Sequence, residues 1–165
     1  MPLWFGAEVQ EMPRRLTAPA GAPDLAALRA ACASLREDSP RKWGTLDAAG
    51  MAEHCARFVD VYAGRIPISP VVAVIARLIG RPFLRRLLAT PPERAARGMA
   101  TAPAMRVTGR QDFAAAHARL EAALDEAAGW TGPKQHPMYG PMEGEEMQIL
   151  VAHHTAHHFR QFGLI

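Results

Sequence analysis

Four of the seven histidines of the chain stand close together near its end, as two pairs with a spacing of four residues. The pairs are His153 with His157 and His154 with His158. Residues three or four apart lie on one face of an α-helix. On a helical wheel, His154 and His158 fall in the middle of the apolar face, and His153 and His157 fall on its flank. The apolar face is formed by Met147, Leu150, Val151 and Phe162.

Two imidazoles on a buried helix face need polar partners, because each neutral ring carries one donor and one acceptor. Histidines four residues apart on a helix present two nitrogens to the same point, and this arrangement is typical of metal sites. The alternative is a pair of hydrogen-bonded core histidines without an ion. The spacing by itself leaves both interpretations open.

Amphipathic helices are expected to position these side chains. Periodic apolar residues predict helices over residues 24–37, 47–63, 112–128 and 142–162. Asp24, Asp47 and Asp112 are predicted N-caps, and an acidic first turn suits the positive end of the last helix. His54 lies on the inward face of the second helix, which adds a third candidate imidazole.

The second and third helices are joined by a long connection, residues 64–111, with one or two short helices predicted over 70–80 and 82–89. The connection is basic through Arg77, Arg81, Arg85, Arg86, Arg94 and Arg97. A solvated face, a rim that attracts an anionic substrate and a patch that rests on acidic lipid all agree with this pattern. The apolar run is too short to span a membrane, and arginines interrupt it.

Composition indicates one domain. A chain of 165 residues can bury a core without disulfides, and we expect an irregular arm over 1–23 followed by a single domain over 24–165. Cys32 and Cys55 imply no disulfide framework, which is typical of a reducing compartment. The first residues resemble neither a signal peptide nor an anchor, so we expect a cytoplasmic protein. A net charge of +3 does not predict nucleic-acid binding.

A short internal repeat indicates how the helices are paired. The segments 43–51 and 139–147 share an aromatic residue, then Gly, and a Met at equal spacing. Each stands before the second helix of a pair. Two helical hairpins joined by a long crossover predict an all-α four-helix bundle, in which the second and fourth helices lie side by side. His54 could then meet His154 and His158.

Three motifs resemble the DinB-like superfamily. They are Trp43-Gly44-Thr45-Leu46 with His54, then His136-Pro137-Met138-Tyr139-Gly140, and finally the segment from His154 through His157, His158, Gln161 and Phe162 to Gly163. Within that superfamily they are similar to a group catalogued as a domain of unknown function. Gly50, Tyr139 and Glu143 depart from the group's pattern, but none of them is a candidate ligand.

The resemblance implies a four-helix bundle in up-down-down-up order. It also implies a divalent metal held by His54, His154 and His158. Characterised relatives are metal-dependent transferases and isomerases that use a thiol cofactor, so a small thiol cosubstrate is implied as well. Zinc, nickel and iron all suit a site made of histidines.

Three neutral histidines leave a coordination position for water or a thiolate, as in catalytic sites. His157 and His136 are candidate proton-transfer residues, and Gln161 and Tyr62 are candidates to orient a ligand ring. His153 is expected to be exposed, His117 to be a core-edge residue and Cys55 to be a buried structural thiol.

Two functions follow. The first is a metal-dependent transferase or hydrolase acting on a small molecule. The second is a non-catalytic metal-binding or structural bundle. A homodimer is compatible with either function.

Overall fold

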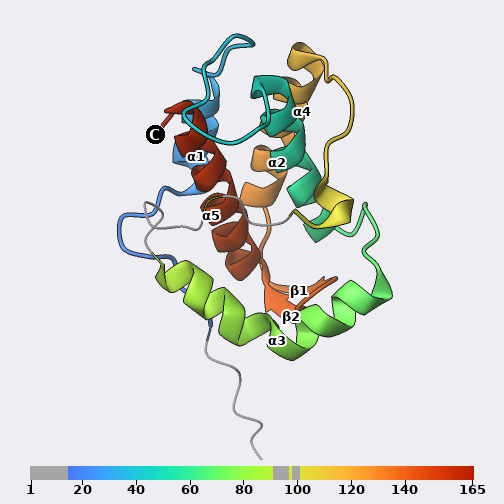
Figure 1. The fold of residues 1–165 in the computed structure, drawn as a ribbon. Coiled ribbons are helices and arrows are strands. Elements are labelled where there is room, and N and C mark those ends of the chain that lie inside the picture. The colour runs from blue at the N-terminus through green and yellow to red at the C-terminus, as the bar shows by residue number, and fades with distance from the viewer. Residues whose placement is uncertain (1–14, 91–96, 98–100) are drawn as a thin grey trace, which may run out of the picture.

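The computed structural model describes residues 15–90, 97 and 101–165, and these residues are mostly helical. The elements in chain order are α1 (Leu25–Cys32), α2 (Ala48–Tyr62), α3 (Pro70–Ala89), the short 3-10 helix η2 (Pro103–Met105), α4 (Phe113–Ala128), β1 (Pro133–His136), β2 (Gly140–Glu143) and α5 (Gly144–Phe162). Helices α1, α2, α4 and α5 pack against one another, while α3 crosses one end of the molecule beside the two strands (Figure 1). The N-terminal part of the expected arm, residues 1–14, lies outside the described residues.

Three aspartates begin three of the helices, as the sequence predicts. The carboxylates of Asp24, Asp47 and Asp112 each accept a hydrogen bond from the backbone N–H three residues later. Helix α1 ends at Cys32 rather than near residue 37, because the chain continues in tight turns. Those turns still place Leu35 in the core, where 1% of it is exposed.

The segment between the helices predicted over 112–128 and 142–162 contains a hairpin, and the last helix begins at Gly144 rather than at residue 142. Strands β1 and β2 are antiparallel, with His136 opposite Gly140. The turn between them is closed by a side chain, since His136 Nδ1 accepts hydrogen bonds from the N–H groups of Met138 and Tyr139 at 3.0 and 3.1 Å. The fold is therefore not purely helical. Strands this short carry no alternating pattern that sequence periodicity could detect.

The connection between α2 and α4 contains one helix of 20 residues, where one or two short helices were predicted. Helix α3 runs through Pro82, which is exposed. A proline inside a helix removes one backbone hydrogen bond, but on the exposed side the freed carbonyl can reach water. One side of α3 is attached to the rest of the fold by Leu84 and Leu88, which are buried. Within this connection, residues 91–96 and thus Arg94 lie outside the described part.

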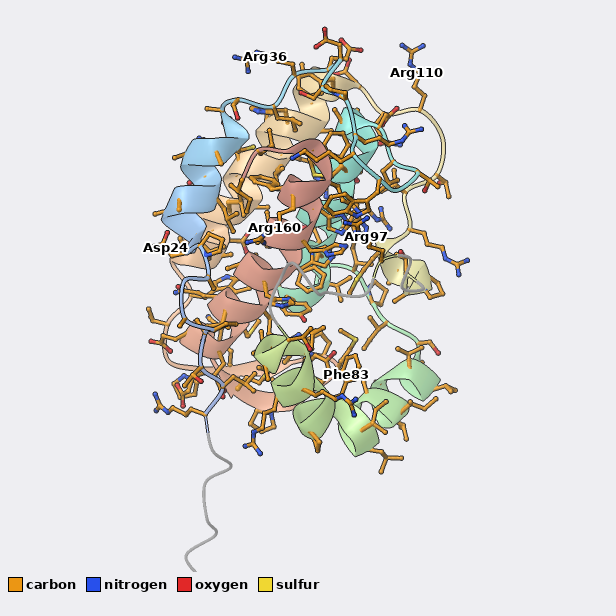
Figure 2. The ribbon with its side chains drawn as sticks, turned by 60° about the vertical axis from the view of Figure 1, so that its left-hand side comes forward. Asp24, Arg36, Phe83, Arg97, Arg110 and Arg160 are labelled. Atoms are coloured by element: carbon orange, nitrogen blue, oxygen red, sulfur yellow. The ribbon has the colours of Figure 1, made fainter. Side chains whose placement is uncertain are left out.

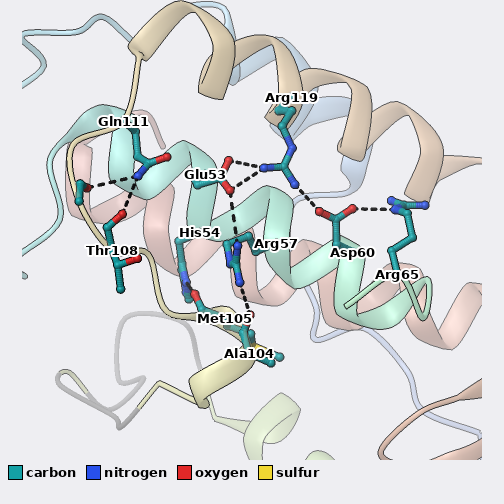
Figure 3. A network of polar contacts seen from close by, with 11 residues as sticks. Glu53, His54, Arg57, Asp60, Arg65, Ala104, Met105, Thr108, Gln111 and Arg119 are labelled. Carbon is teal, nitrogen blue, oxygen red and sulfur yellow. Dashed lines mark hydrogen bonds and ion pairs between the residues drawn. The ribbon is translucent and has the colours of Figure 1, made fainter. Parts of the chain in front are cut away.

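The core lies between α1, α2, α4 and α5. Its fully buried large side chains include Leu28, Leu35, Met51, Leu120, Leu124, Met147, Val151 and Phe159. Ion pairs along the outside join α2 to α4, because Arg119 contacts both Glu53 and Asp60 (Figure 3). No helix among the described residues is both long and apolar enough to cross a membrane.

Candidate metal centre

Helices α2 and α5 bring three imidazoles together in the interior. His54 comes from the middle of α2, and His154 and His158 are one turn apart on α5. One ring nitrogen from each lies within 4.8 Å of the other two. The Nε2 atoms of His54 and His154 are 3.2 Å apart. The ring centroids of His158 lie 4.7 Å from those of His54 and His154. This group of atoms could hold a metal ion.

The crossover determines which nitrogen of His54 faces the group. His54 Nδ1 lies 2.8 Å from the carbonyl oxygen of Met105, at the end of η2 (Figure 3). A carbonyl can only accept, so Nδ1 carries the proton. In the neutral ring Nε2 then has a free lone pair, and this is the nitrogen that faces His154.

The ring of His158 is oriented in the same way by a residue one turn further along α5. Its Nδ1 lies 2.9 Å from Gln161 Oε1, which leaves Nε2 with the lone pair. The Gln161 side chain is confined by close packing, because a Cβ added to Gly44 would lie 3.2 Å from Gln161 Nε2. The backbone oxygen of Gln161 also accepts a hydrogen bond from the Lys42 N–H.

His154 is oriented by an aromatic ring instead of a hydrogen bond. Its ring is stacked on that of Phe58, with centroids 3.8 Å apart and planes inclined by 9°. Its Nδ1 is buried and has no hydrogen-bond partner among the described residues. Phe58 is one turn after His54 on α2, so one helix supplies both a neighbour and a support for His154. This role of Phe58 depends on the packing of α2 against α5, which helical periodicity does not predict.

Burial keeps the three rings neutral. It lowers the pKa of His54 below its usual 6.5, although the hydrogen bond to Met105 opposes this shift. Burial also holds the pKa of His154 well below that value, and it lowers the pKa of His158 to about 3, in each case with a contribution from neighbouring histidines. Neutral rings with lone pairs that face each other suit a cation. Without an ion, a proton on His154 Nε2 could bridge to His54 Nε2 instead.

The candidate centre contains three donor side chains, all of them histidines. Among the described residues, no carboxylate or thiol joins the group formed by the three histidines. Three neutral nitrogen ligands fit a divalent metal and leave further coordination positions for other molecules. This arrangement is typical of catalytic rather than closed structural sites.

The flanking histidines of α5 lie next to the group but outside it. The ring of His157 is 5.3 Å from that of His158, in an edge-to-face arrangement, and 6.4 Å from Trp43. Its pKa is lowered by burial and by Arg160 and Arg97. His153 is half-buried, and its Nε2 is enclosed, so the expectation that it is exposed was wrong. A wheel cannot reveal this, because the covering residues belong to other parts of the chain.

His136 and Tyr62 lie further along an aromatic row. The ring centroids of His136 and Tyr62 are 4.1 Å apart, and the two rings meet edge to face. The ring centroids of Tyr62 and Phe58 are 4.3 Å apart, and Phe58 in turn stacks on His154. His136 is fully buried, and burial lowers its pKa to about 3. Its Nδ1 is occupied by the hairpin turn. The structure therefore gives His136 a role in the hairpin, and it does not bring this side chain into the group of three.

A second group of possible ligands consists of Cys32, His117 and Glu121. Ordinary contacts account for its members. His117 Nε2 lies 3.0 Å from the carbonyl oxygen of Cys32, to which it donates, and Glu121 pairs with Arg29 at 2.7 Å. Burial raises the pKa of the Cys32 thiol to about 12. Cys55 is a free thiol that is buried on α2, and burial raises its pKa as well.

Comparison with known families places the site within a larger group of proteins. The family model for the DinB superfamily matches residues 48–162, which is more than half of the chain. The match spans α2 through α5 and includes all three histidines of the candidate centre. Searches of curated proteins and of solved structures gave no match at the level of significance required. On the strength of the family match, the chain belongs to the DinB superfamily.

Proposed function

We propose that His54, His154 and His158 bind one divalent metal ion through their Nε2 atoms, and that the protein is a metal-dependent enzyme acting on a small molecule. The observation that carries the proposal is the pair of hydrogen bonds at His54 Nδ1 and His158 Nδ1. Both leave an Nε2 lone pair, and the three rings converge from two helices. The outer partners of metal-bound histidines act in this way in other proteins.

The reaction class we favour is thiol transfer to an electrophile, with hydrolysis as the alternative. A divalent metal held by three neutral histidines supplies a Lewis acid that lowers the pKa of a bound water or thiol. Zinc and nickel suit the donor set best, and iron is compatible with it. A small thiol would be the cosubstrate of the transfer reaction.

Side chains around the group support the binding and proton-transfer steps. His157 is half-buried beside His158, with its pKa lowered by burial, so a neutral ring is available there to accept a proton. Gln161 holds the His158 ring. Arginine charges lower the pKa of two of these histidines. Arg57 acts on His54, and Arg97 and Arg160 act on His157. Cationic surroundings favour a substrate with an anionic group.

A second function is supported by one contact. Because the Nε2 atoms of His54 and His154 are 3.2 Å apart, they can share a proton and join α2 to α5 without any ion. The protein would then be a non-catalytic helical module, with a structural metal or none. Metal content separates the two functions.

The proposal extends to the organisation of the protein. It includes the four-helix bundle in up-down-down-up order, a single domain over 24–165 and membership of the group with the His-Pro-x-Phe-Gly motif. We also propose a cytoplasmic location, since both cysteines are free thiols. A homodimer is compatible with these features.

The decisive experiment measures metal in the purified full chain, in His154→Ala and in His153→Ala. His153 is a matched control, because it is adjacent on the same helix and outside the group. We expect about one equivalent of zinc, nickel or iron in the native chain and in His153→Ala, and a loss of that metal in His154→Ala. Circular dichroism confirms folding of each variant. An unchanged metal content in a folded His154→Ala protein would rule out the proposed centre.

A further inference from the structure

The outer side of α3 is an apolar surface. Among the described residues, the large apolar side chains that are exposed lie on this helix, apart from Ile165. They are Val71, Val74, Ile75, Leu78, Ile79 and Phe83. Leu78 is the most exposed, at 77%. Residues at this spacing share one side of a helix, so they form a single surface, called here the α3 surface.

The opposite side of α3 is already occupied by the protein. Leu84 and Leu88 are buried, and Gly80 is packed closely against Tyr139 of the hairpin. A Cβ on Gly80 would come within 2.7 Å of Tyr139 Cδ1, which shows how closely the helix is attached there. Helix α3 is thus attached to the protein by one of its sides. It lies across one end of the molecule, where Figure 2 labels Phe83. The α3 surface faces away from the core.

The charges of α3 are all of one sign. The helix contains Arg77, Arg81, Arg85 and Arg86 and has no Asp or Glu in its sequence. At about 100° per residue, Arg77 falls beside one border of the α3 surface, and Arg85 and Arg86 fall within its arc near the C-terminal end of the helix. Apolar residues and arginines on the same helix are typical of helices that lie in the plane of a membrane interface. Long arginine side chains can reach headgroups while the apolar residues between them enter the acyl region.

Charge complementarity selects the partner. Two copies of the α3 surface packed against each other would bring arginines of both copies close together, and the sequence of the helix contains no Asp or Glu. An anionic lipid surface supplies negative charge to arginines that lie near it. The helix is also unsuited to crossing a bilayer, since no described helix meets that requirement.

We propose that α3 is a membrane-surface helix that binds bilayers containing anionic phospholipid. It inserts Leu78, Ile79 and their apolar neighbours between headgroups and holds phosphates with the exposed Arg77 and Arg86. This inference rests on the α3 surface and is independent of the proposed metal chemistry.

The test uses the full chain and flotation with vesicles of phosphatidylcholine, either alone or mixed with phosphatidylserine. We expect binding to the mixed vesicles, weak binding to phosphatidylcholine alone and a decrease with added salt. The double variant Leu78→Ser with Ile79→Ser should lose binding. Both residues are exposed, so the fold is not expected to change.

A charge variant and its matched control show whether vesicle binding depends on the arginines of α3 or only on the total charge of the protein. Replacing Arg77 and Arg86 by Gln should weaken binding to the mixed vesicles about 30-fold, from two lost contacts. Replacing Arg36 and Arg110 by Gln removes the same charge from exposed positions at the end of the molecule away from α3 (Figure 2). That control should bind as the native chain does.

Three results would overturn the proposal. The first is absence of binding to the mixed vesicles, and the second is equal loss of binding in both arginine variants. The third is a native dimer, measured by light scattering, that Leu78→Ser with Ile79→Ser converts to a monomer, because the α3 surface would then be a contact between copies. Metal content measured in the same variants should stay unchanged, so failure here is distinguishable from failure of the metal centre.

Discussion

Each histidine of the candidate centre is oriented by a different neighbour. A backbone carbonyl holds His54, a side-chain amide holds His158 and an aromatic face holds His154. The first two contacts determine the tautomer, because the acceptor requires the proton on Nδ1. The third determines only the ring plane. Loss of these supports should therefore affect metal affinity in different ways.

Gln161 provides a direct test of the orienting contacts. Replacing Gln161 by Ala removes the acceptor at His158 Nδ1, so the ring and its tautomer are no longer determined. We expect metal affinity, measured by competition with a chromogenic chelator, to fall about 10–100-fold. Gln161→Glu keeps an acceptor at the same place and should retain metal binding. Equal affinity in Gln161→Ala and the native chain would show that this contact does not support the site.

His136 predicts a pH dependence of stability. Its pKa is about 3 in the folded chain and close to 6.5 when unfolded, because burial disfavours the charged ring. Between these values the unfolded state binds more protons, so the free energy of unfolding falls as the pH decreases from about 6.5. The free energy of unfolding falls by up to about 1.4 kcal/mol for each pH unit in this range.

The comparison is urea unfolding of the native chain and of His136→Asn at pH 7 and pH 5. An asparagine oxygen can still accept the N–H bonds of the hairpin turn, but it does not titrate. The variant should therefore lose less stability on acidification than the native chain. The other buried histidines are present in both proteins and cancel in the difference. Parallel pH profiles would contradict the prediction.

At the scale of elements, the start of α5 positions two of the three histidines. Glu146 is buried, and its carboxylate accepts hydrogen bonds from the N–H groups of Leu16 and Glu143. One side chain thus joins residue 16 to the first turn of α5. Beside it, Gly144 lies against the backbone that follows α4. A change here alters how α5 meets α4, and so alters the position of the whole histidine face.

Gly144 should not tolerate a methyl group. A Cβ at this position would lie 2.6 Å from the backbone of Trp130 and Thr131, which cannot move as a flexible side chain can. Overpacking of this kind costs about 1–3 kcal/mol. Gly144 is the first residue of α5, so alanine gains less there than the roughly 1 kcal/mol of a helix interior. We expect Gly144→Ala to have a lower free energy of unfolding in urea.

Gly129→Ala is the matched control for Gly144→Ala. A Cβ added at Gly129 would lie 3.4 Å from its nearest neighbour, the backbone oxygen of Glu126. Alanine readily adopts the φ of −83° found there. This control should unfold within about 0.5 kcal/mol of the native chain. Equal stability of the two variants would show that the approach of α5 to α4 is less close than described.

At the scale of the whole molecule, the proposed metal joins helices from opposite halves of the sequence. His54 and His154 are 100 residues apart, whereas Glu53 and Asp60 of α2 pair with Arg119 of α4. A ligand that binds only the folded chain stabilises it by mass action. The metal should therefore raise the stability of the entire helical assembly and not of α5 alone.

Thermal unfolding with and without metal tests this coupling. At a free metal concentration of 100 times Kd, the native chain should gain about 2.7 kcal/mol, seen as a higher Tm. His54→Ala should show no such rise, and His117→Ala should show the native one, because His117 lies outside the group on α4. The comparison is made within each variant, so any loss of stability from the substitution itself cancels. A metal-induced rise in His54→Ala equal to the native rise would exclude His54 as a ligand.

The sequence by itself determined the helices with their aspartate caps and placed His54, His154 and His158 on inward faces. These features depend on spacing and on contacts within a few residues, so a local pattern carries them. It did not reveal the hairpin closed by His136, the full length of α3 or the half-buried state of His153.

Only the tertiary structure decided which nitrogen of His54 faces inward and how the ring of His154 is oriented. The Met105 carbonyl reaches His54 from 51 residues away, and Phe58 on α2 stacks against His154 on α5. Such contacts arise when distant segments pack, and helical periodicity describes a face without saying what will cover it. For the same reason, periodicity alone could not tell which apolar side of α3 packs against the protein and which is exposed. The structure shows that Leu84 and Leu88 are buried and that the α3 surface is not.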